Sequence, residues 1–138
     1  MSKQPIEEAK RWLRSAELNR EGMNYSKGAY VLEMALEIAL KVVLNSSGKN
    51  LQKRHDILVP LEELFMLHPR RYSANFRNML NSIKPVFNYL MDVRQASDYG
   101  CENSITEDNF RDILEENYEK VVMAIETCDE ERKQLTKN

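Results

Sequence analysis

The fold is decided by residues 27–45, Lys27-Gly-Ala-Tyr-Val-Leu-Glu-Met-Ala-Leu-Glu-Ile-Ala-Leu-Lys-Val-Val-Leu-Asn45. Drawn as a helix, this stretch is apolar on nearly every side, and such a helix belongs in the middle of a helical domain. Its polar residues Glu33, Glu37 and Lys41 recur at every fourth position, so they lie on one stripe. The sequence therefore predicts a central helix that carries a single narrow polar seam (Glu33, Glu37 and Lys41).

The segment before it, about 5–24, has the features of an amphipathic helix. Pro5 suits the first helical position, and Glu7 and Glu8 are favoured in the first turn by the helix dipole. The apolar stripe comprises Ala9, Trp12, Leu13, Ala16 and Met23. Residues 25–28 are expected to connect this helix to the central one.

Two helices are expected in the middle of the chain. Asp56 can cap a short one, in which Pro60 lies in the first turn, where the missing N–H costs least. A long one spans about 74–97, and Pro85 should kink or divide it near Asn81 and Ser82. The inward-facing positions are Leu58, Leu61, Leu64 and Phe65 in the short helix, and Phe76, Leu80, Ile83, Phe87, Leu90 and Met91 in the long one.

The last helix is expected after Thr106, a good N-cap, with Ile105 and Phe110 placed as a hydrophobic staple. Its core positions are Phe110, Ile113, Leu114, Val121, Ala124, Ile125 and Cys128, and residues 132–138 are expected to be a frayed tail. Because short connections favour antiparallel neighbours, we predict an all-α, antiparallel up-and-down bundle of four long helices plus a short third helix. The whole chain, 1–138, is expected to form this single domain.

Composition excludes several classes of protein. No stretch approaches the roughly 18 apolar residues of a membrane span, and the N-terminus lacks an apolar signal core, so we expect a cytoplasmic protein without membrane contact. Cys101 and Cys128 form no metal or redox motif and are expected to be free thiols. The chain also lacks the Glu-x-x-His pairs of di-iron bundles. We therefore expect no metal and no cofactor.

Charge is distributed unevenly along the chain. Residues 49–84 carry seven Lys/Arg against three acids, whereas residues 85–138 carry six against thirteen. The middle of the chain is thus the region expected to face an anion, and the C-terminal third would repel nucleic acid. The candidate basic rim of such a site comprises Lys53, Arg54, Arg70 and Arg71.

Arg94 is the strongest candidate for a functional residue, in the stretch Arg94-Gln-Ala-Ser-Asp-Tyr-Gly100. An arginine presents a fixed fork of donors to phosphate or carboxylate. Alternatively, it pairs with Asp98 one helical turn later. It is also the natural partner for the seam if Glu37 and its neighbours are buried, whereas an exposed seam would hold only an intrahelical Glu37–Lys41 pair. His55 is read either as a structural residue or as a proton-transfer group.

Four stretches together resemble the HEPN superfamily of small helical proteins. They are Glu8-Ala-Lys-Arg-Trp-Leu-Arg-Ser-Ala-Glu17, then Gly28-Ala-Tyr30 with Met34-Ala-Leu-Glu-Ile-Ala-Leu-Lys41, then Gly48 followed by His55-Asp-Ile-Leu58 and Leu61, and finally Arg94 to Gly100. The resemblance implies an antiparallel helical bundle that forms a homodimer. Many such proteins are metal-independent ribonucleases paired with a minimal nucleotidyltransferase in toxin–antitoxin systems, and others bind nucleotides or act without catalysis.

The ribonuclease signature is an arginine that binds phosphate, followed a few residues later by a histidine that assists the attack. By resemblance the arginine is Arg94, and Tyr99 takes the histidine's place. A phenol with a pKa near 10 is a poor base at neutral pH. The chain therefore resembles the branch of the superfamily that has a motif of the Arg-x-x-Ala-Asp-Tyr type and lacks the catalytic histidine. The candidate ligand-binding residues are Arg94, Asp98, Tyr99, Glu37, Lys41 and His55.

Three functions remain open from the sequence. In the first, the protein binds nucleotide or RNA without strong catalysis, with Arg94 on the phosphate and Tyr99 stacking on a base. In the second, it is the partner of a minimal nucleotidyltransferase in a toxin–antitoxin-like pair, and Arg94 is structural through Asp98 or Glu37. In the third, it is a ribonuclease that uses Arg94 with Tyr99 or His55.

Overall fold

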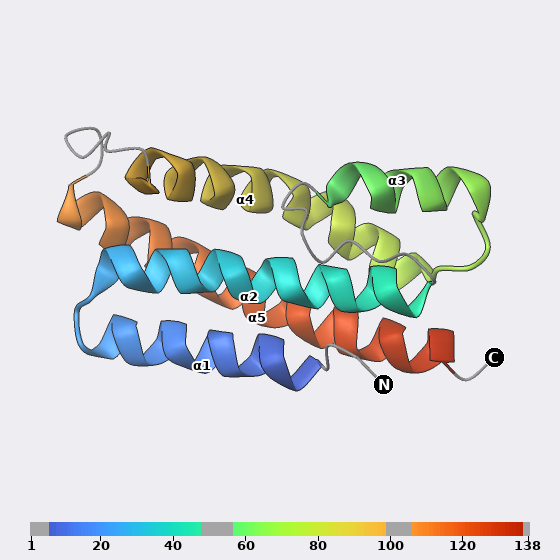
Figure 1. Cartoon of the computed structure of the whole chain (residues 1–138), viewed down its shortest axis with the longest axis horizontal. Coiled ribbons are helices and arrows are strands. Elements are labelled where there is room, and N and C mark those ends of the chain that lie inside the picture. Colours follow the sequence, from blue (N-terminus) through green and yellow to red (C-terminus); the bar gives the residue numbers. More distant parts are fainter. Residues whose placement is uncertain (1–5, 48–56, 99–105, 137–138) are drawn as a thin grey trace.

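The computed structural model describes residues 6–47, 57–98 and 106–136, with the backbone alone for 95–98. Five helices fill these ranges: α1 (Ile6–Glu21), α2 (Tyr25–Ser46), α3 (Leu58–Leu67), α4 (Ala74–Asp98) and α5 (Glu107–Thr136) (Figure 1). The described residues contain no strand, which confirms the predicted all-α class. None of these five helices combines the length and hydropathy of a membrane span.

The central element is α2, as its composition predicts. Fifteen of its 22 residues are buried, and the helix packs against α1, α4 and α5. It lies close to α5 at Gly28, where a Cβ atom would stand 2.6 Å from Cδ2 of Leu114. The absence of a side chain at Gly28 therefore lets the two helices meet at this point.

The connection between α1 and α2 differs from the prediction. α1 ends at Glu21, and α2 already begins at Tyr25. Between them Met23 adopts a left-handed φ of 63°, the conformation that closes many helices, and its side chain is 71% exposed. Met23 was expected in the apolar stripe of the first helix, and this expectation is wrong because the helix stops before reaching it.

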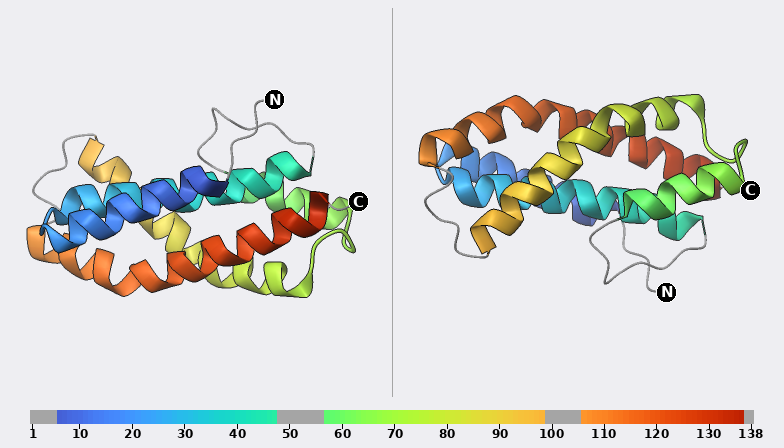
Figure 2. Two further views of the ribbon diagram at one scale, coloured as in Figure 1. Left: turned by 90° about the horizontal axis from the view of Figure 1, so that it is seen from below. Right: turned by 90° about the horizontal axis from the view of Figure 1, so that it is seen from above.

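Pro85 does not divide α4, which is one helix of 25 residues. Its direction changes partway along: one half follows α5, and the other crosses towards the start of α2 (Figure 2, right). A bend is the expected response to a proline, which removes one helical hydrogen bond and crowds the preceding turn. All six apolar positions predicted for this helix are buried or half-buried.

The ends of α5 are fixed by side chains. Thr106 caps it as predicted, since its Oγ1 accepts a hydrogen bond from the backbone N–H of Asn109 at 3.2 Å. The helix runs on to Thr136, beyond the predicted onset of fraying at 132. Leu135 packs against the core and holds this last turn in place. Ile105 and Asp56, the predicted staple and cap residues, lie outside the described ranges.

A buried carboxylate ties the start of α4 to α5. Glu131 is 3% exposed, and its two oxygens accept hydrogen bonds from the backbone N–H of Ser73 at 2.9 Å and from its hydroxyl at 2.6 Å. Oγ of Ser73 in turn accepts the N–H of Phe76 at 3.1 Å and so caps α4. One side chain on α5 therefore sets where α4 begins.

Replacing Glu131 by alanine is expected to lower the free energy of unfolding by about 2–3 kcal/mol, because hydrogen bonds to a buried charged group are lost. Glu130→Ala is the matched control, since Glu130 is exposed on the same helix and should change stability by less than about 0.5 kcal/mol. Urea unfolding followed by circular dichroism measures both. Equal stabilities of the two variants would contradict the role given to Glu131.

Candidate functional site

The polar seam of α2 is buried and receives a cation from α4. Glu33 and Glu37 are 0% and 1% exposed, and Lys41 is 6% exposed. Arg94, near the end of α4, is 8% exposed and reaches into this seam. The structure therefore assembles four charged side chains, two acidic and two basic, inside the bundle.

The geometry shows which pairs form. Nη1 of Arg94 donates to Oε1 of Glu33 at 2.7 Å and lies 3.8 Å from Oε1 of Glu37. Nζ of Lys41 donates to Oε2 of Glu37 at 3.0 Å. The intrahelical pair and the interhelical pair were alternatives in the sequence, and the structure contains both. The predicted contact between Arg94 and the seam is thus present, with Glu33 as its closest carboxylate.

Two buried polar atoms of this cluster lack hydrogen-bond partners, and burial shifts one pKa. Neither Oε2 of Glu33 nor Nε of Arg94 has a hydrogen-bond partner among the described contacts. Loss of hydration, together with the nearby charge of Glu37, raises the pKa of Glu33 from its ordinary value of 4.5 to about 8, although Arg94 opposes this shift. At neutral pH the Glu33 carboxyl therefore holds a proton more readily than a solvated carboxyl does.

A small pocket opens beside Arg94, at the start of α2. It has a volume of about 180 Å³ and is lined by Ser26, Lys27, Tyr30, Val93, Arg94 and Phe110. The guanidinium carbon of Arg94 lies 5.8 Å from the centre of the Tyr30 ring. We call this the α2 pocket.

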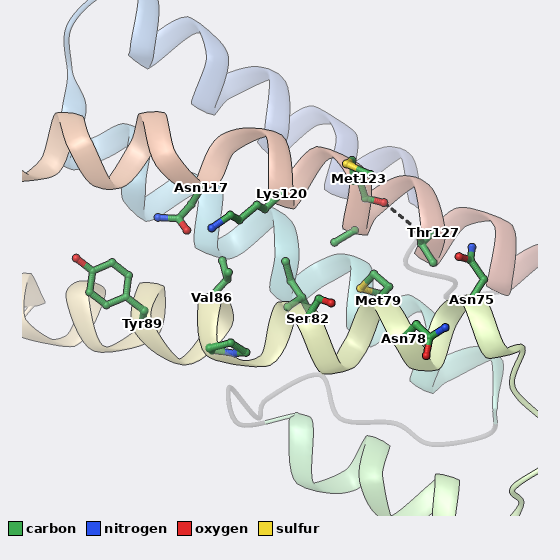
Figure 3. A pocket seen from close by; sticks show the side chains of 13 residues that line it. Asn75, Asn78, Met79, Ser82, Val86, Tyr89, Asn117, Lys120, Met123 and Thr127 are labelled. Carbon is green, nitrogen blue, oxygen red and sulfur yellow. Dashed lines mark hydrogen bonds between the residues drawn. The ribbon is translucent and has the colours of Figure 1, made fainter.

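A larger groove lies between α4 and α5 (Figure 3). It has a volume of about 660 Å³, and Val86 and Met79 of α4 face α5 across it. Exposed apolar groups border it: Met123 is 67% and Tyr89 48% exposed. We call this the α4–α5 groove. This groove was not predicted, because helical spacing does not reveal how far apart two helices pack.

The structure separates other residues that the sequence grouped together. Arg70 and Arg71 are exposed in the connection before α4, whereas Arg94 lies near the opposite end of that 25-residue helix. They therefore do not border the α2 pocket, contrary to the predicted basic rim. Lys53, Arg54, His55 and Tyr99 lie outside the described residues, and Asp98 is described by its backbone alone.

Metal and thiol chemistry find no support in the described part of the chain. No group of three His, Cys, Asp or Glu side chains there is placed to hold a metal ion. Cys128 is a buried free cysteine, and burial raises the pKa of its thiol, which makes it unreactive. Cys101 lies outside the described ranges.

A helical bundle whose central helix carries a buried charged seam, closed by an arginine of the penultimate helix, defines the structural class of this protein. The family model for the HEPN domain matches residues 2–128, nearly the whole chain. The chain therefore belongs to the HEPN-domain family. Comparison with curated proteins and with solved structures gives no significant match.

Arg94→Ala is expected to lower the free energy of unfolding by about 3–5 kcal/mol, because it leaves the buried Glu33 carboxyl without its partner. Arg111→Ala serves as control: this side chain is 48% exposed, and its surface pairs contribute at most about 1 kcal/mol. Adding Glu33→Gln to Arg94→Ala should recover part of the loss. Chemical denaturation measures all three variants, and a loss below about 1 kcal/mol for Arg94→Ala contradicts a structural ion pair.

The pKa of Glu33 makes a second prediction, on pH dependence. Because this pKa is higher in the folded than in the unfolded chain, the folded state binds the extra proton between about pH 4.5 and pH 8. The stability that Glu33 contributes is therefore fully present below about pH 4.5 and is lost as pH rises through about 8.

We expect the stability difference between wild type and Glu33→Gln to shift against wild type from pH 5 to pH 8, by at most about 1.4 kcal/mol per pH unit. Denaturant titrations of both proteins at pH 5, 6, 7 and 8 test this. The comparison cancels the other titrating groups, and parallel stability curves would show that the pKa of Glu33 is not raised.

Proposed function

We propose that this HEPN-domain protein is non-catalytic and acts by binding a protein partner, a minimal nucleotidyltransferase, in a toxin–antitoxin-like pair. The observation that carries the proposal is the burial of Arg94 against Glu33, at 2.7 Å, with 8% of the side chain exposed. A partner-binding role leaves Arg94 free to be a structural residue. An arginine that assists RNA cleavage must instead have its donors open to the phosphate.

Chemistry at the site also argues against catalysis. A ribonuclease arginine offers its fork to the phosphate, whereas Nη1 of Arg94 is already taken by a carboxylate. Tyr99 occupies the position of the histidine in the family signature, and its phenol is a weak base at neutral pH. General acid–base help is worth about 10²–10⁴ in rate, so its loss leaves little cleavage.

The α4–α5 groove is the surface that we assign to the partner. Its exposed methionine, Met123, and the ring of Tyr89 are the kinds of group that form the centre of protein interfaces. The outer side of α5 carries exposed acids, among them Glu116, Glu119 and Glu126. A segment of the partner with an apolar face and basic flanks is complementary to this surface.

Nucleotide or RNA binding is the second candidate, and the α2 pocket beside Arg94 favours it. An extended RNA is less well supported, because Arg70 and Arg71 precede the start of α4, at the opposite end of that helix from the pocket, and the exposed side of α5 is acidic. We also propose that the protein forms the homodimer that the family resemblance implies. Light scattering of the isolated protein measures its molar mass and so tests this.

The proposal requires a minimal nucleotidyltransferase gene next to the gene of this protein, and co-expression of that enzyme with the tagged protein tests the proposed partner. We expect the two to co-purify, and Met123→Glu to reduce recovery of the partner at least about tenfold, because a buried charge is costly in an interface. Met66→Glu is the matched control, since Met66 is also exposed, at 84%, but lies on α3. Both variants should keep the stability of the wild type.

Two outcomes would contradict the proposal. Recovery of wild type without the nucleotidyltransferase, or equal recovery with both methionine variants, removes the assigned partner or its surface. Cleavage of RNA in the presence of a chelator, abolished by a charge-preserving Arg94→Lys variant that remains folded, would instead establish the protein as a ribonuclease.

A further inference from the structure

We propose that the α4–α5 groove binds the free C-terminal end of a protein chain, held as an extended peptide with its terminal carboxylate next to Lys120. The inference rests on the proposed function, which assigns this groove to a partner protein, and it names the part of the partner that enters. Three observations lead to it: the charge of the lining, a buried amide that faces the groove, and the shape of the remaining surface.

The first observation is the charge of the lining. Among the 13 described residues that line the groove, only Lys120 carries a formal charge, although the exposed side of α5 is acidic. Glu116 stands four residues before Lys120, the spacing of an intrahelical pair, yet Lys120 takes part in none of the ion pairs that the described part of α5 forms. This ammonium is therefore complementary to one negative group on a ligand.

The second observation is the amide of Asn117. The side chain is 6% exposed, and its Nδ2 donates to the backbone oxygen of Ile113 at 2.7 Å. This bond fixes the orientation of the amide group, so that Oδ1 points towards α4 and accepts no hydrogen bond among the described contacts (Figure 3). An acceptor that lies this deep needs a donor from whatever fills the groove. The ligand is therefore expected to carry an N–H group as well as a negative charge.

The last residue of a protein chain has both groups close together. Its carboxylate can pair with Nζ of Lys120 while its N–H donates to Oδ1 of Asn117, because residues three apart on a helix lie on the same face. Tyr89 of α4 lies at the same end of the groove, and its hydroxyl is a further donor for a carboxylate (Figure 3). A fatty acid has the carboxylate without the N–H, and an internal segment has the N–H without the carboxylate.

The third observation is that the rest of the groove suits an extended chain. Asn75 and Asn78 bring two more side-chain amides to its other end (Figure 3). An amide offers a donor and an acceptor to peptide groups, which an extended chain leaves open and a helix satisfies internally. From Asn75 to Tyr89 α4 rises by about 21 Å, the length of about six extended residues. The buried floor between the ends is apolar and comprises Ile83, Val86 and Ala124.

Fluorescence anisotropy with the isolated protein tests the site. The probe is a library of fluorescein-labelled hexapeptides that begin with lysine and end in apolar residues, each made with a free carboxylate and with a C-terminal amide. We expect the tightest-binding acid to bind at least about tenfold more strongly than its own amide, because the amide loses a charge-assisted hydrogen bond. Lys120→Met keeps the apolar part of the side chain and should remove this difference.

Two further variants separate the contacts. Lys133→Met is the matched control, since Lys133 is also an exposed lysine of α5 but does not line the groove, and it should preserve the difference between acid and amide. Asn117→Ala, checked for folding by circular dichroism, should weaken acid and amide alike by about fivefold, because both probes donate the same N–H.

The inference is overturned if no peptide binds, or if acid and amide bind equally, which identifies docking of an internal segment. It is also overturned if Lys120→Met halves the molar mass measured by light scattering, which identifies a second copy of this chain as the occupant. A nucleotidyltransferase that co-purifies, while no peptide acid is preferred over its amide, overturns the inference alone. A preferred peptide acid, without recovery of any nucleotidyltransferase, overturns the proposed function alone.

Discussion

The hydrogen bond from Arg94 to Glu33, 2.7 Å long and closed off from water, is the interaction on which the arrangement of the bundle depends. An apolar helix such as α2 can be packed by its neighbours in many rotations at similar cost, because hydrophobic contacts are not directional. A buried carboxyl without a cation costs several kcal/mol. Arg94 meets Glu33 at 2.7 Å in the register of α4 on α2 that the structure has. We infer that the seam selects this register, while apolar burial supplies most of the stability.

How far the sequence predicts this structure depends on the range of the forces involved. The helical pattern of α2, the cap at Thr106 and the inward positions of α4 follow from periods of three and four residues, and the structure has them. Met23 was misplaced because Gly22, which directly follows the last residue of α1, was not taken as the end of that helix. Local spacing fixes which residues face inward, whereas the turn between helices depends on how α1 meets α2.

In the candidate site, too, features of a single helix could be predicted from the sequence, whereas features that join several helices could not. Its seam was visible because Glu33, Glu37 and Lys41 interrupt an apolar helix at regular intervals, and Arg94 was the natural cation to meet them. The α2 pocket was not visible, because it joins the first turn of α2 to residues near the end of α4 and to Phe110 of α5. Two residues of the expected basic rim, Arg70 and Arg71, lie away from Arg94 for a related reason: a basic stretch of sequence does not show how far a long helix separates its residues from Arg94.

Arg94 connects the seam to the α2 pocket, and this sharing has a physical consequence. A guanidinium that is bonded to a carboxylate through one nitrogen cannot swing out to follow a substrate, so the pocket is held in a fixed shape by the same bond that sets the register. Rigid placement of the cation favours binding of a fixed anion, because little side-chain entropy is lost. It disfavours cleavage, which needs donors that strengthen their contacts as charge develops in the transition state. The bond that sets the register of α4 on α2 thus also holds the guanidinium of Arg94 in place.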